Sequence, residues 1–486
     1  MKSKQILSLS LAACLTIGSL AGAGEAQAKA KAKKPVLSKT KMTAYIGKTK
    51  TLKVKKNGTK KIVKTKWTLS GKKVAKLSKK KKTSVTIKGL KKGSATVKAK
   101  VWYQKKGAKK KKKVTLKCKV SVTKYVSPEA KKKANVLNAT TKYQPLAKLA
   151  AQHGFKLGTV VNYTNVTTND NYKNLVKYHF NSLTAGNEFK AYSLLDQAKS
   201  AKSKDGMPVM NYDKADTIIS FAKENGIQMR GHVLVWHAYM CDWFFREGYD
   251  TSKKYVSKAV MQKRLQYYIK EVITHFEKKY PGVIYCWDVV NEAVNDDGTM
   301  RTSSNWYKVY GDAGYVTDAF TFARKYADKD VKLFLNDYNE YAAAKRDRIY
   351  QVVKDLYDKG LCDGVGMQSH YSMTSPTIAA VKVAIQKYNQ IDPGKIEIQL
   401  TELDIHNTFR TAADQKSVAT KYQSLFNMLV DSRRNQKINI TGVTFWGLTD
   451  GDSWLSDFKG ETSYPLLFGA DYAAKSAYFA VLNAAK

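Results

Sequence analysis

Cysteine is scarce in this chain: 486 residues contain five, and no two form a Cys-x-x-Cys pair or join histidines at zinc-ligand spacing. This pattern argues against a structural metal, and we expect neither a metal nor a cofactor. Four cysteines follow the first 28 residues, and the sequence alone does not pair them: Cys118, Cys241, Cys286 and Cys362. Cys286 lies inside an apolar run, so we expect a buried thiol there.

No uninterrupted apolar run of membrane-spanning length follows the first 28 residues, and we expect no transmembrane span. Residues 1–28 combine a basic start, a small-residue apolar stretch and an Ala-Gln-Ala end, which is the pattern of a secretory signal peptide. We therefore expect a secreted, extracellular protein. A lipid anchor at Cys14 is the weaker alternative, because the apolar stretch continues well past that residue.

Arginine is absent from residues 29–133, which hold 40 lysines and a single acidic residue, Glu129. This segment carries +39 of the formal net charge of +47, and residues 134–486 carry only +7. Self-repulsion of this size destabilises a fold, and solubility does not require it. We expect the segment to bind anionic cell-wall polymers, such as teichoic acids or acidic polysaccharides; a solvated surface without a partner is the alternative. Nucleic acid is not expected, because Arg and any base-reading motif are missing.

Residues 35–123 alternate apolar or threonine residues with lysine, the period-two pattern of half-buried strands. Turn signals separate these runs: Asn57-Gly58, Ser70-Gly71, Lys92-Gly93 and Lys106-Gly107. Short strands at this spacing predict a small all-β sandwich. The strings VAKLS, VTIKGLKKGSATVKAKV and CKVSV resemble the bacterial group 2 immunoglobulin-like domain. Residues 124–135 combine proline and charge without periodicity, which predicts a linker.

From residue 136 to the C-terminus, apolar runs alternate with helical stretches that have apolar residues at i, i+3, i+4 and i+7. The apolar runs occupy residues 155–163, 178–187, 228–237, 282–292, 332–338, 363–370, 397–405 and 442–450. This alternation predicts an α/β fold, a (β/α)8 TIM barrel over residues 136–486 with enlarged loops. A doubly wound sheet is disfavoured, because no glycine-rich phosphate loop follows the first strand.

Two glutamates stand where apolar runs end, Glu292 after VIYCWDVVN and Glu402 in IEIQLTELDI. Two carboxylates on separate strand ends are what glycosidic bond cleavage needs, one as acid and the other as nucleophile or base. Further polar and aromatic residues follow the third to eighth runs, where such barrels place active sites. A single buried histidine or tryptophan is usually structural. Their occurrence at six strand ends predicts an active site.

The segments GHVLVWH, WDVVNEAVND, NDYN, GVGMQSHY, IQLTELDI and FWGLTDGDSW closely resemble, in this order, the signatures of glycoside hydrolase family 10, the endo-β-1,4-xylanases. The resemblance implies a retaining hydrolase of xylan or xylo-oligosaccharides, with Glu402 as nucleophile and Glu292 as acid/base. It implies supporting roles for His370, Asp404 and Asn291. It also implies substrate contacts for Asn187, Lys190, His232, Trp236, Gln368, Asn336, Tyr338, Trp446 and Trp454, the first five of them in the glycone subsites.

Two positions depart from the family's pattern. Gly186 stands where the family often has Glu, and Tyr239 where it usually has Gln or Asn. Both changes concern substrate binding, so we expect hydrolysis with altered subsite affinities or a preference for decorated xylan. The alternatives are another β-1,4-glycanase or a hydrolase of short xylo-oligosaccharides. A non-catalytic wall- or xylan-binding protein is disfavoured, because both Glu292 and Glu402 are retained.

Overall fold

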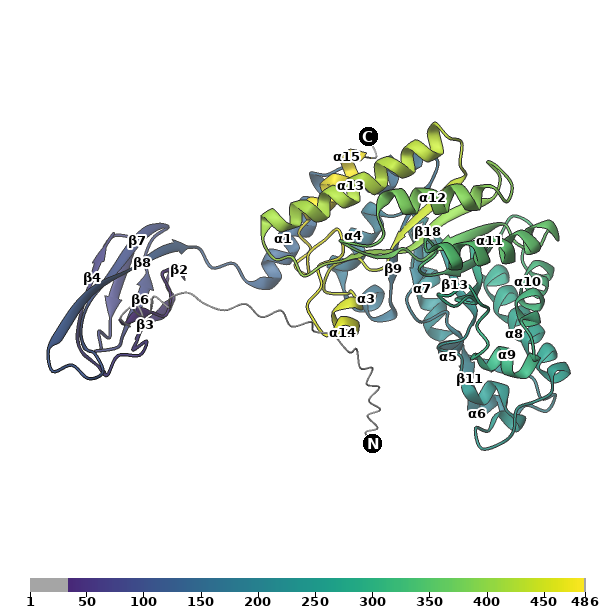
Figure 1. Ribbon diagram of the computed structural model, residues 1–486, viewed down its shortest axis with the longest axis horizontal. Helices are drawn as coiled ribbons and strands as arrows, with labels where there is room; N and C mark the ends of the chain where they lie inside the picture. The colour runs from purple at the N-terminus through teal and green to yellow at the C-terminus, as the bar shows by residue number, and fades with distance from the viewer. Residues whose placement is uncertain (1–33, 485–486) are drawn as a thin grey trace, which may run out of the picture. The chain divides into compact units, whose positions relative to one another are not determined.

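The computed structural model describes residues 34–484 and divides the chain between Val126 and Ser127 into two compact units (Figure 1). The signal peptide predicted for residues 1–28 lies outside the described residues. Within residues 34–484, no helix is long and apolar enough to cross a membrane. The four cysteines of this part of the chain are free thiols, and Cys286 is buried as expected.

The N-terminal unit consists of two four-stranded sheets that share one apolar core. One sheet has the order β1 (Val36–Leu37), β3 (Thr49–Lys55), β6 (Ser84–Gly89) and β5 (Ala75–Ser78). The other has the order β2 (Lys41–Tyr45), β8 (Lys111–Thr123), β7 (Gly93–Gln104) and β4 (Lys61–Ser70). Burial alternates along these strands, as the period-two pattern predicts. The all-β architecture is therefore as expected, and its assignment as an immunoglobulin-like domain stays a prediction.

The linker prediction is wrong from Pro128 onward, because helix α1 (Pro128–Thr141) begins there. The hydroxyl of Ser127 caps the helix by accepting the N–H of Ala130 at 3.1 Å, and proline suits the first helical position. Val136 and Ala139 bury this helix in the core of the second unit. The second unit therefore starts at Ser127 rather than at residue 136.

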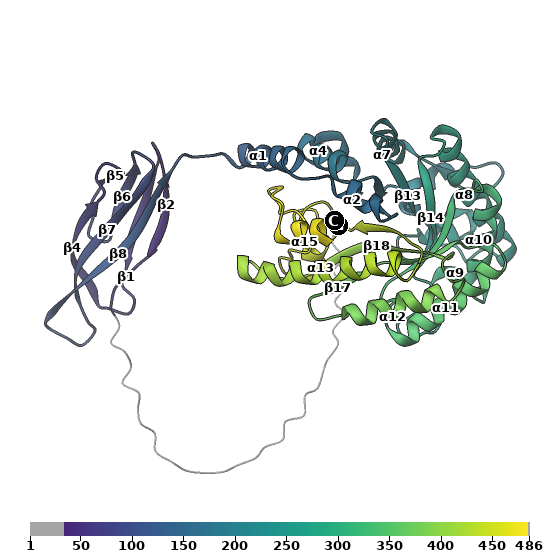
Figure 2. The same cartoon turned by 90° about the horizontal axis from the view of Figure 1, so that it is seen from above.

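The second unit is built on eight parallel strands that close into a barrel, as predicted (Figure 2). Each expected apolar run contains one strand. In order around the barrel these are β9 (Lys156–Val161), β10 (Ser182–Ala185), β13 (Gln228–Trp236), β14 (Ile284–Asn291), β15 (Lys332–Asp337), β16 (Gly364–Met367), β18 (Glu397–His406) and β19 (Ile440–Phe445). Pairing of β19 with β9 closes the ring.

Amphipathic helices surround the barrel (Figure 2). The longer ones are α2 (Leu146–Gln152), α4 (Asp170–His179), α7 (Asp213–Glu224), α8 (Lys258–Lys279), α10 (Gly314–Tyr326), α11 (Ala343–Asp358), α12 (Ile378–Asn389), α13 (Ala412–Arg434) and α15 (Ser476–Ala484). In α8 the hydroxyl of Ser257 caps the N-terminus, and Met261, Leu265 and Val272 are among the residues of its buried face.

Short elements fill the loops between these helices and strands. They are α3 (Tyr163–Thr168), α5 (Ala191–Leu194), β11 (Leu195–Asp196), α6 (Gln197–Ser200), β12 (Val209–Met210), α9 (Asn305–Tyr310), β17 (His370–Ser372), α14 (Leu455–Lys459) and the 3-10 helices η1 (Asp242–Phe245) and η2 (Glu247–Tyr249). Because all eight barrel strands are parallel, their carboxyl ends meet at one end of the barrel.

Candidate active site

The two glutamates are delivered to the carboxyl end of the barrel by strands β14 and β18. Glu292 directly follows β14 and adopts a left-handed backbone conformation with φ of 59°. A non-glycine residue in this region is uncommon and is held there by its surroundings. Here the N–H of Glu292 donates to the carbonyl of Asn336 on the neighbouring strand β15 at 2.9 Å. Glu402 lies within β18 and is buried.

Side-chain amides link the two carboxylates into one network. Asn336 Nδ2 donates to Glu402 Oε1 at 2.7 Å and to Asn291 Oδ1 at 2.9 Å. Asn291 Nδ2 in turn donates to Glu292 Oε1 at 3.1 Å. Gln368 Nε2 reinforces this arrangement, because it donates to Glu292 Oε1 at 2.9 Å and to Asn291 Oδ1 at 3.1 Å. The network therefore fixes the positions of the two carboxylates relative to each other.

A second chain of contacts holds Glu402 in its ionised form. His370 Nε2 lies 3.1 Å from Glu402 Oε2, and His370 Nδ1 lies 3.1 Å from Asp404 Oδ1. The indole N–H of Trp454 donates to the other Asp404 oxygen at 3.0 Å. Burial lowers the pKa of His370, but the carboxylates of Asp404 and Glu402 outweigh it and raise that pKa to about 10. His370 is therefore a cation at neutral pH.

The same contacts act on Glu402. Burial would raise its pKa, but the hydrogen bond from His370, the charges of His232 and His370 and the bond from Asn336 together hold the pKa below its usual value. Only 6% of its side chain is exposed, against 14% for Glu292. Glu402 is thus a carboxylate with fixed donors on both oxygens, poised for a role that requires negative charge.

His237 and Arg301 complete the surroundings of Glu292, and neither was among the predicted site residues. His237 Nδ1 lies 3.8 Å from Glu292 Oε2. Burial, with the cations Arg301 and Lys345, lowers the pKa of His237 to about 4, so this imidazole is neutral above that pH. Arg301 Nε donates to the backbone carbonyl of Glu292 at 2.8 Å, and its Nη2 donates to the hydroxyl of Tyr338 at 3.2 Å. His237 belongs to the GHVLVWH segment, whereas no sequence pattern marks Arg301 as a site residue.

A buried ion pair lies behind Glu292. Lys345 Nζ, from the start of α11, is 2.9 Å from Asp337 Oδ1 at the end of β15, and both side chains are buried. Burial raises the pKa of Asp337 to about 7, although Lys345 opposes this, and the nearby charge of Glu292 adds to the rise. Asp337 lies in the NDYN segment, but Lys345 occupies an ordinary helix position that no sequence pattern marks.

Aromatic rings and cations line the side of the site that the resemblance assigns to the glycone. Lys190 Nζ donates to Asn187 Oδ1 at 3.3 Å and lies 5.1 Å from the ring centre of Trp236. Burial lowers the pKa of Lys190, and the carboxylates of Glu402 and Glu292 oppose that shift. His232 donates to Asp288 at 2.9 Å, and its ring lies 5.4 Å from that of Trp446.

Tyr239 joins this side of the site. Its ring centre lies 5.1 Å from that of Trp236 and 5.4 Å from that of Tyr192, and 58% of the residue is exposed. Lys190 Nζ lies 5.1 Å from the same ring. The aromatic residue that stands where the resemblance leads one to expect an amide therefore extends a surface of neighbouring, tilted rings.

Glu188, two residues after Gly186, does not supply the carboxylate that position 186 lacks. Glu188 accepts the backbone N–H of Tyr163 at 2.7 Å and that of Asn187 at 3.2 Å, which turns its carboxylate toward the backbone. The predicted site residues nevertheless lie in one cluster. The ring of Trp446 lies 6.1 Å from that of His370, and the ring of His232 lies 6.5 Å from that of Trp236, while Tyr338 joins the cluster through Arg301.

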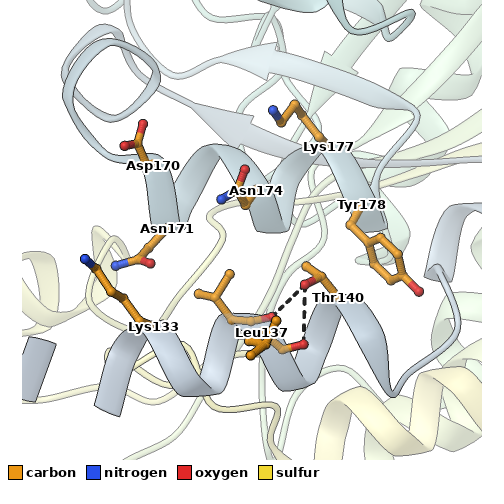
Figure 3. A pocket seen from close by; sticks show the side chains of 9 residues that line it. Lys133, Leu137, Thr140, Asp170, Asn171, Asn174, Lys177 and Tyr178 are labelled. Atoms are coloured by element: carbon orange, nitrogen blue, oxygen red, sulfur yellow. Dashed lines mark hydrogen bonds between the residues drawn. The ribbon is translucent and has the colours of Figure 1, made fainter. Parts of the chain in front are cut away.

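A separate groove of about 530 Å³ lies between α1 and α4 (Figure 3). Its lining includes Lys133, Leu137, Asn171 and Lys177. The hydroxyl of Thr140, which also lines it, donates within its own helix to the carbonyl of Val136 at 3.0 Å. None of the predicted site residues lines this groove, so it is distinct from the carboxylate cluster.

Comparison with known proteins agrees with this geometry. Residues 145–484 match the sequence model of the family described as glycosyl hydrolase family 10. The chain is 40% identical over 353 residues to endo-1,4-beta-xylanase B of Butyrivibrio fibrisolvens. The aligned region covers 72% of this chain and 53% of that relative. The chain therefore spans about half the length of this curated relative.

Solved structures give the same result. The CBM22-1 and GH10 modules of Clostridium thermocellum endo-1,4-beta-D-xylanase 10B, complexed with xylohexaose, align with a TM-score of 0.63 at 33% identity. That match covers 83% of this chain and 73% of the other. An intracellular xylanase of Thermoanaerobacterium saccharolyticum aligns with a TM-score of 0.62 at 34% identity, covering 70% of this chain and 99% of the other.

Proposed function

The chain belongs to glycosyl hydrolase family 10, and on this basis we propose that it is a secreted endo-1,4-β-xylanase that hydrolyses internal bonds of xylan with retention of configuration. The observation that carries the proposal is the hydrogen-bonded path from Glu292 through Asn291 and Asn336 to Glu402. It places two carboxylates with different surroundings at one site, as glycoside hydrolysis requires.

In the first step, Glu402 attacks the anomeric carbon while the bond to the leaving oxygen breaks. Glu292, protonated at the outset, gives its proton to that oxygen. In the second step, Glu292 takes a proton from water, the water oxygen attacks the anomeric carbon, and Glu402 is released. Both steps balance without any other reactant.

The surroundings of each carboxylate support this division of roles. Glu402 is the more buried of the two, contacts the cation of His370 and has a lowered pKa, so it is ionised and ready to attack. Glu292 receives hydrogen bonds from the neutral amides of Asn291 and Gln368 and is more open to water. Asn291 is positioned to contact a sugar hydroxyl beside Glu292, and Asp404 orients His370.

Substrate contacts follow from the position of the remaining cluster residues. The rings of Trp446, Trp454 and Trp236 suit the apolar faces of pyranose rings, while His232, Lys190 and Asn187 offer polar groups on the glycone side. Gly186 and Tyr239 reduce polar contacts there and add an aromatic surface. A preference for short xylo-oligosaccharides or for another β-1,4-glycan is the alternative that these two positions favour.

The remaining parts of the proposal concern the N-terminal region. We propose that residues 1–28 direct secretion and that the N-terminal unit is an immunoglobulin-like domain, which its two-sheet architecture supports. We further propose that its lysines associate the enzyme with anionic cell-wall polymers. N-terminal sequencing of protein recovered from culture medium tests secretion, and a first residue before position 29 would contradict cleavage there.

Release of reducing sugar from xylan, carboxymethyl-cellulose and xylobiose tests the activity. The wild type should favour xylan, Glu292→Ala and Glu402→Ala should lose activity, and Glu224→Gln, a change at an exposed carboxylate of α7, should retain it. No release from xylan by the wild type would overturn the proposal. Proton NMR of the first product tests retention, because an initial α-anomer would contradict double displacement.

A further inference from the structure

The N-terminal unit presents lysines on the outer face of the sheet formed by β2, β8, β7 and β4. Strand register places Lys66 opposite Lys100, Lys98 opposite Lys117, and Lys41 opposite Lys119. Along each strand these lysines alternate with buried core residues, so their side chains lie on the outer side of the sheet. We call this surface the lysine face; its exposed members are Lys41, Lys61, Lys64, Lys66, Lys98, Lys100, Lys111, Lys113, Lys117 and Lys119.

Directly opposed like charges oppose folding. Residues facing each other across strands have Cβ atoms about 5 Å apart, and like charges at that spacing are destabilising. No aspartate or glutamate lies in residues 34–126, so no carboxylate of this unit offsets the repulsion. Solubility requires far less positive charge than this, since a surface of mixed charges with a modest net charge suffices. A bound polyanion would relieve the repulsion.

The second sheet of the same unit provides an internal contrast. There Lys53 of β3 lies opposite Ser84 of β6, and Lys88 of β6 lies opposite Thr49 of β3. One opposed lysine pair occurs, Lys76 with Lys88. The two sheets therefore differ in the arrangement of their lysines, with the dense rows on one side.

An aromatic ring lies among the charges of the lysine face. Trp102 is half-buried, and strand register places it between Lys64 and Lys113. Lys100 Nζ lies 5.6 Å from its ring centre. The ring gives the surface a flat apolar patch that can contact the polyol or sugar part of a polymer.

Lysine determines how an anion is held on this face. An ammonium group binds phosphate as a point charge, whereas the planar fork of arginine binds carboxylate and phosphate alike in a bidentate geometry. The face therefore suits anionic groups that are held by charge density rather than by a fixed contact geometry. Outward lysines recur about every 7 Å along a strand and about every 5 Å across strands, so a polymer with a charge in each repeat unit can meet several at once.

We propose that the lysine face binds a linear polymer with a phosphodiester in every repeat unit, the chemistry of a wall teichoic acid. This deepens the wall association proposed above and rests on it. Binding neutralises several opposed ammonium groups together and releases their counterions. Affinity should therefore fall steeply as salt rises.

Binding of the full chain to purified poly(glycerol phosphate) across a salt series tests the proposal. The face variant combines Lys66→Gln, Lys98→Gln, Lys100→Gln and Lys117→Gln, and the matched control combines Lys53→Gln, Lys55→Gln, Lys76→Gln and Lys88→Gln on the other sheet. The face variant should lose about tenfold or more in affinity and show a shallower salt slope, while the control loses much less. Equal losses of affinity in both variants would show that binding depends on the overall charge of the unit rather than on the lysine face. That result would overturn the proposal.

Further arms identify the ligand and separate binding from hydrolysis. Polygalacturonate and single-stranded DNA should bind more weakly than the phosphodiester polymer, and tighter binding of either overturns the assignment. Absence of wild-type binding at low salt also overturns it. Hydrolysis of soluble xylan should be the same in all three proteins, so failure of the binding proposal leaves the enzymatic one intact. The melting temperature of the face variant should be unchanged or higher, because like-charge pairs have been removed.

Discussion

The two units of this protein treat charge in opposite ways. In the barrel, several buried charges lie beside partners of opposite sign, such as Lys345 with Asp337 and Arg230 with Asp288. In residues 34–126 of the N-terminal unit, exposed lysines of one sheet lie opposite one another, and no carboxylate side chain is present. A nucleophile such as Glu402 must stay ionised at one position, which a fixed cationic partner supplies. Attraction of a polyanion requires only a high density of one sign of charge.

The largest expected effect separates the two carboxylates of the barrel. With xylan as substrate, Glu402→Gln and Glu292→Gln should each reduce kcat/KM by roughly 10⁴-fold or more. With an aryl xylobioside whose leaving group needs no protonation, Glu292→Gln should still release the phenol in a burst, and Glu402→Gln should not. Stopped-flow absorbance measures the burst. A burst from Glu402→Gln and none from Glu292→Gln would reverse the two roles.

Replacing a lysine should have opposite consequences in the two units. Lys345→Met leaves Asp337 buried without its partner and should lower the free energy of unfolding of the barrel unit by about 3 kcal/mol or more. Lys117→Gln on the lysine face should change the stability of its unit by less than about 0.5 kcal/mol, in the favourable direction. Calorimetry or denaturant unfolding measures both. A large loss from Lys117→Gln would contradict the contrast between matched and unmatched charge.

The histidine beside Glu402 gives a pH test of the matched network. The pKa of His370 rises from 6.5 to about 10 in the folded state, so the cation stabilises the fold. This contribution is complete below the unfolded value of 6.5 and is lost as pH rises through about 10. His370→Gln should therefore lower the free energy of unfolding by about 3 kcal/mol in mild acid, with a smaller difference above pH 10.

Urea unfolding of wild type and variant at each pH isolates this contribution, because the lysines shared by both proteins cancel in the difference. A stability difference that stays constant across the alkaline range would show that His370 contributes by packing alone. Denaturation midpoints should be compared at constant ionic strength, since salt changes the self-repulsion of the N-terminal unit.

The smallest expected effect concerns the aromatic surface at Tyr239. Tyr239→Ala should raise KM for xylo-oligosaccharides by several-fold to about tenfold with little change in kcat, because a stacking ring contributes about 1 kcal/mol. Tyr239→Phe keeps the ring and should keep the wild-type KM. Initial-rate kinetics on oligosaccharides of increasing length measure both constants. Equal losses in the two variants would assign the contribution to the hydroxyl instead.

Local patterns in the sequence predicted most of the barrel and the central residues of its site. Apolar runs matched all eight strands, because a strand buried on both faces is apolar throughout its length. Glu292 and Glu402 stood out because polar residues ended such runs. Helix α1 was missed although Ser127-Pro128-Glu129 is a helix-start signal, since proline and charge were taken to indicate a linker.

Contacts between distant segments were beyond such patterns. Lys345, near the start of α11, pairs with Asp337 at the end of β15, and Arg301 reaches the backbone of Glu292 from a loop. Neither residue type is unusual at its position in the sequence. The sequence likewise did not show what Glu188 binds, because only the fold brings its carboxylate to the N–H of Tyr163.

By itself, the sequence determined which residues are apolar, which segments form strands, where the two carboxylates follow them and how much positive charge precedes the barrel. Tertiary structure alone decided which of these groups meet. It made Glu402 an ionised carboxylate through His370, and it set Lys66 against Lys100 through strand register. The physical reason is that burial and electrostatic coupling depend on distances in space, and those distances exist only once strands far apart in the chain have paired.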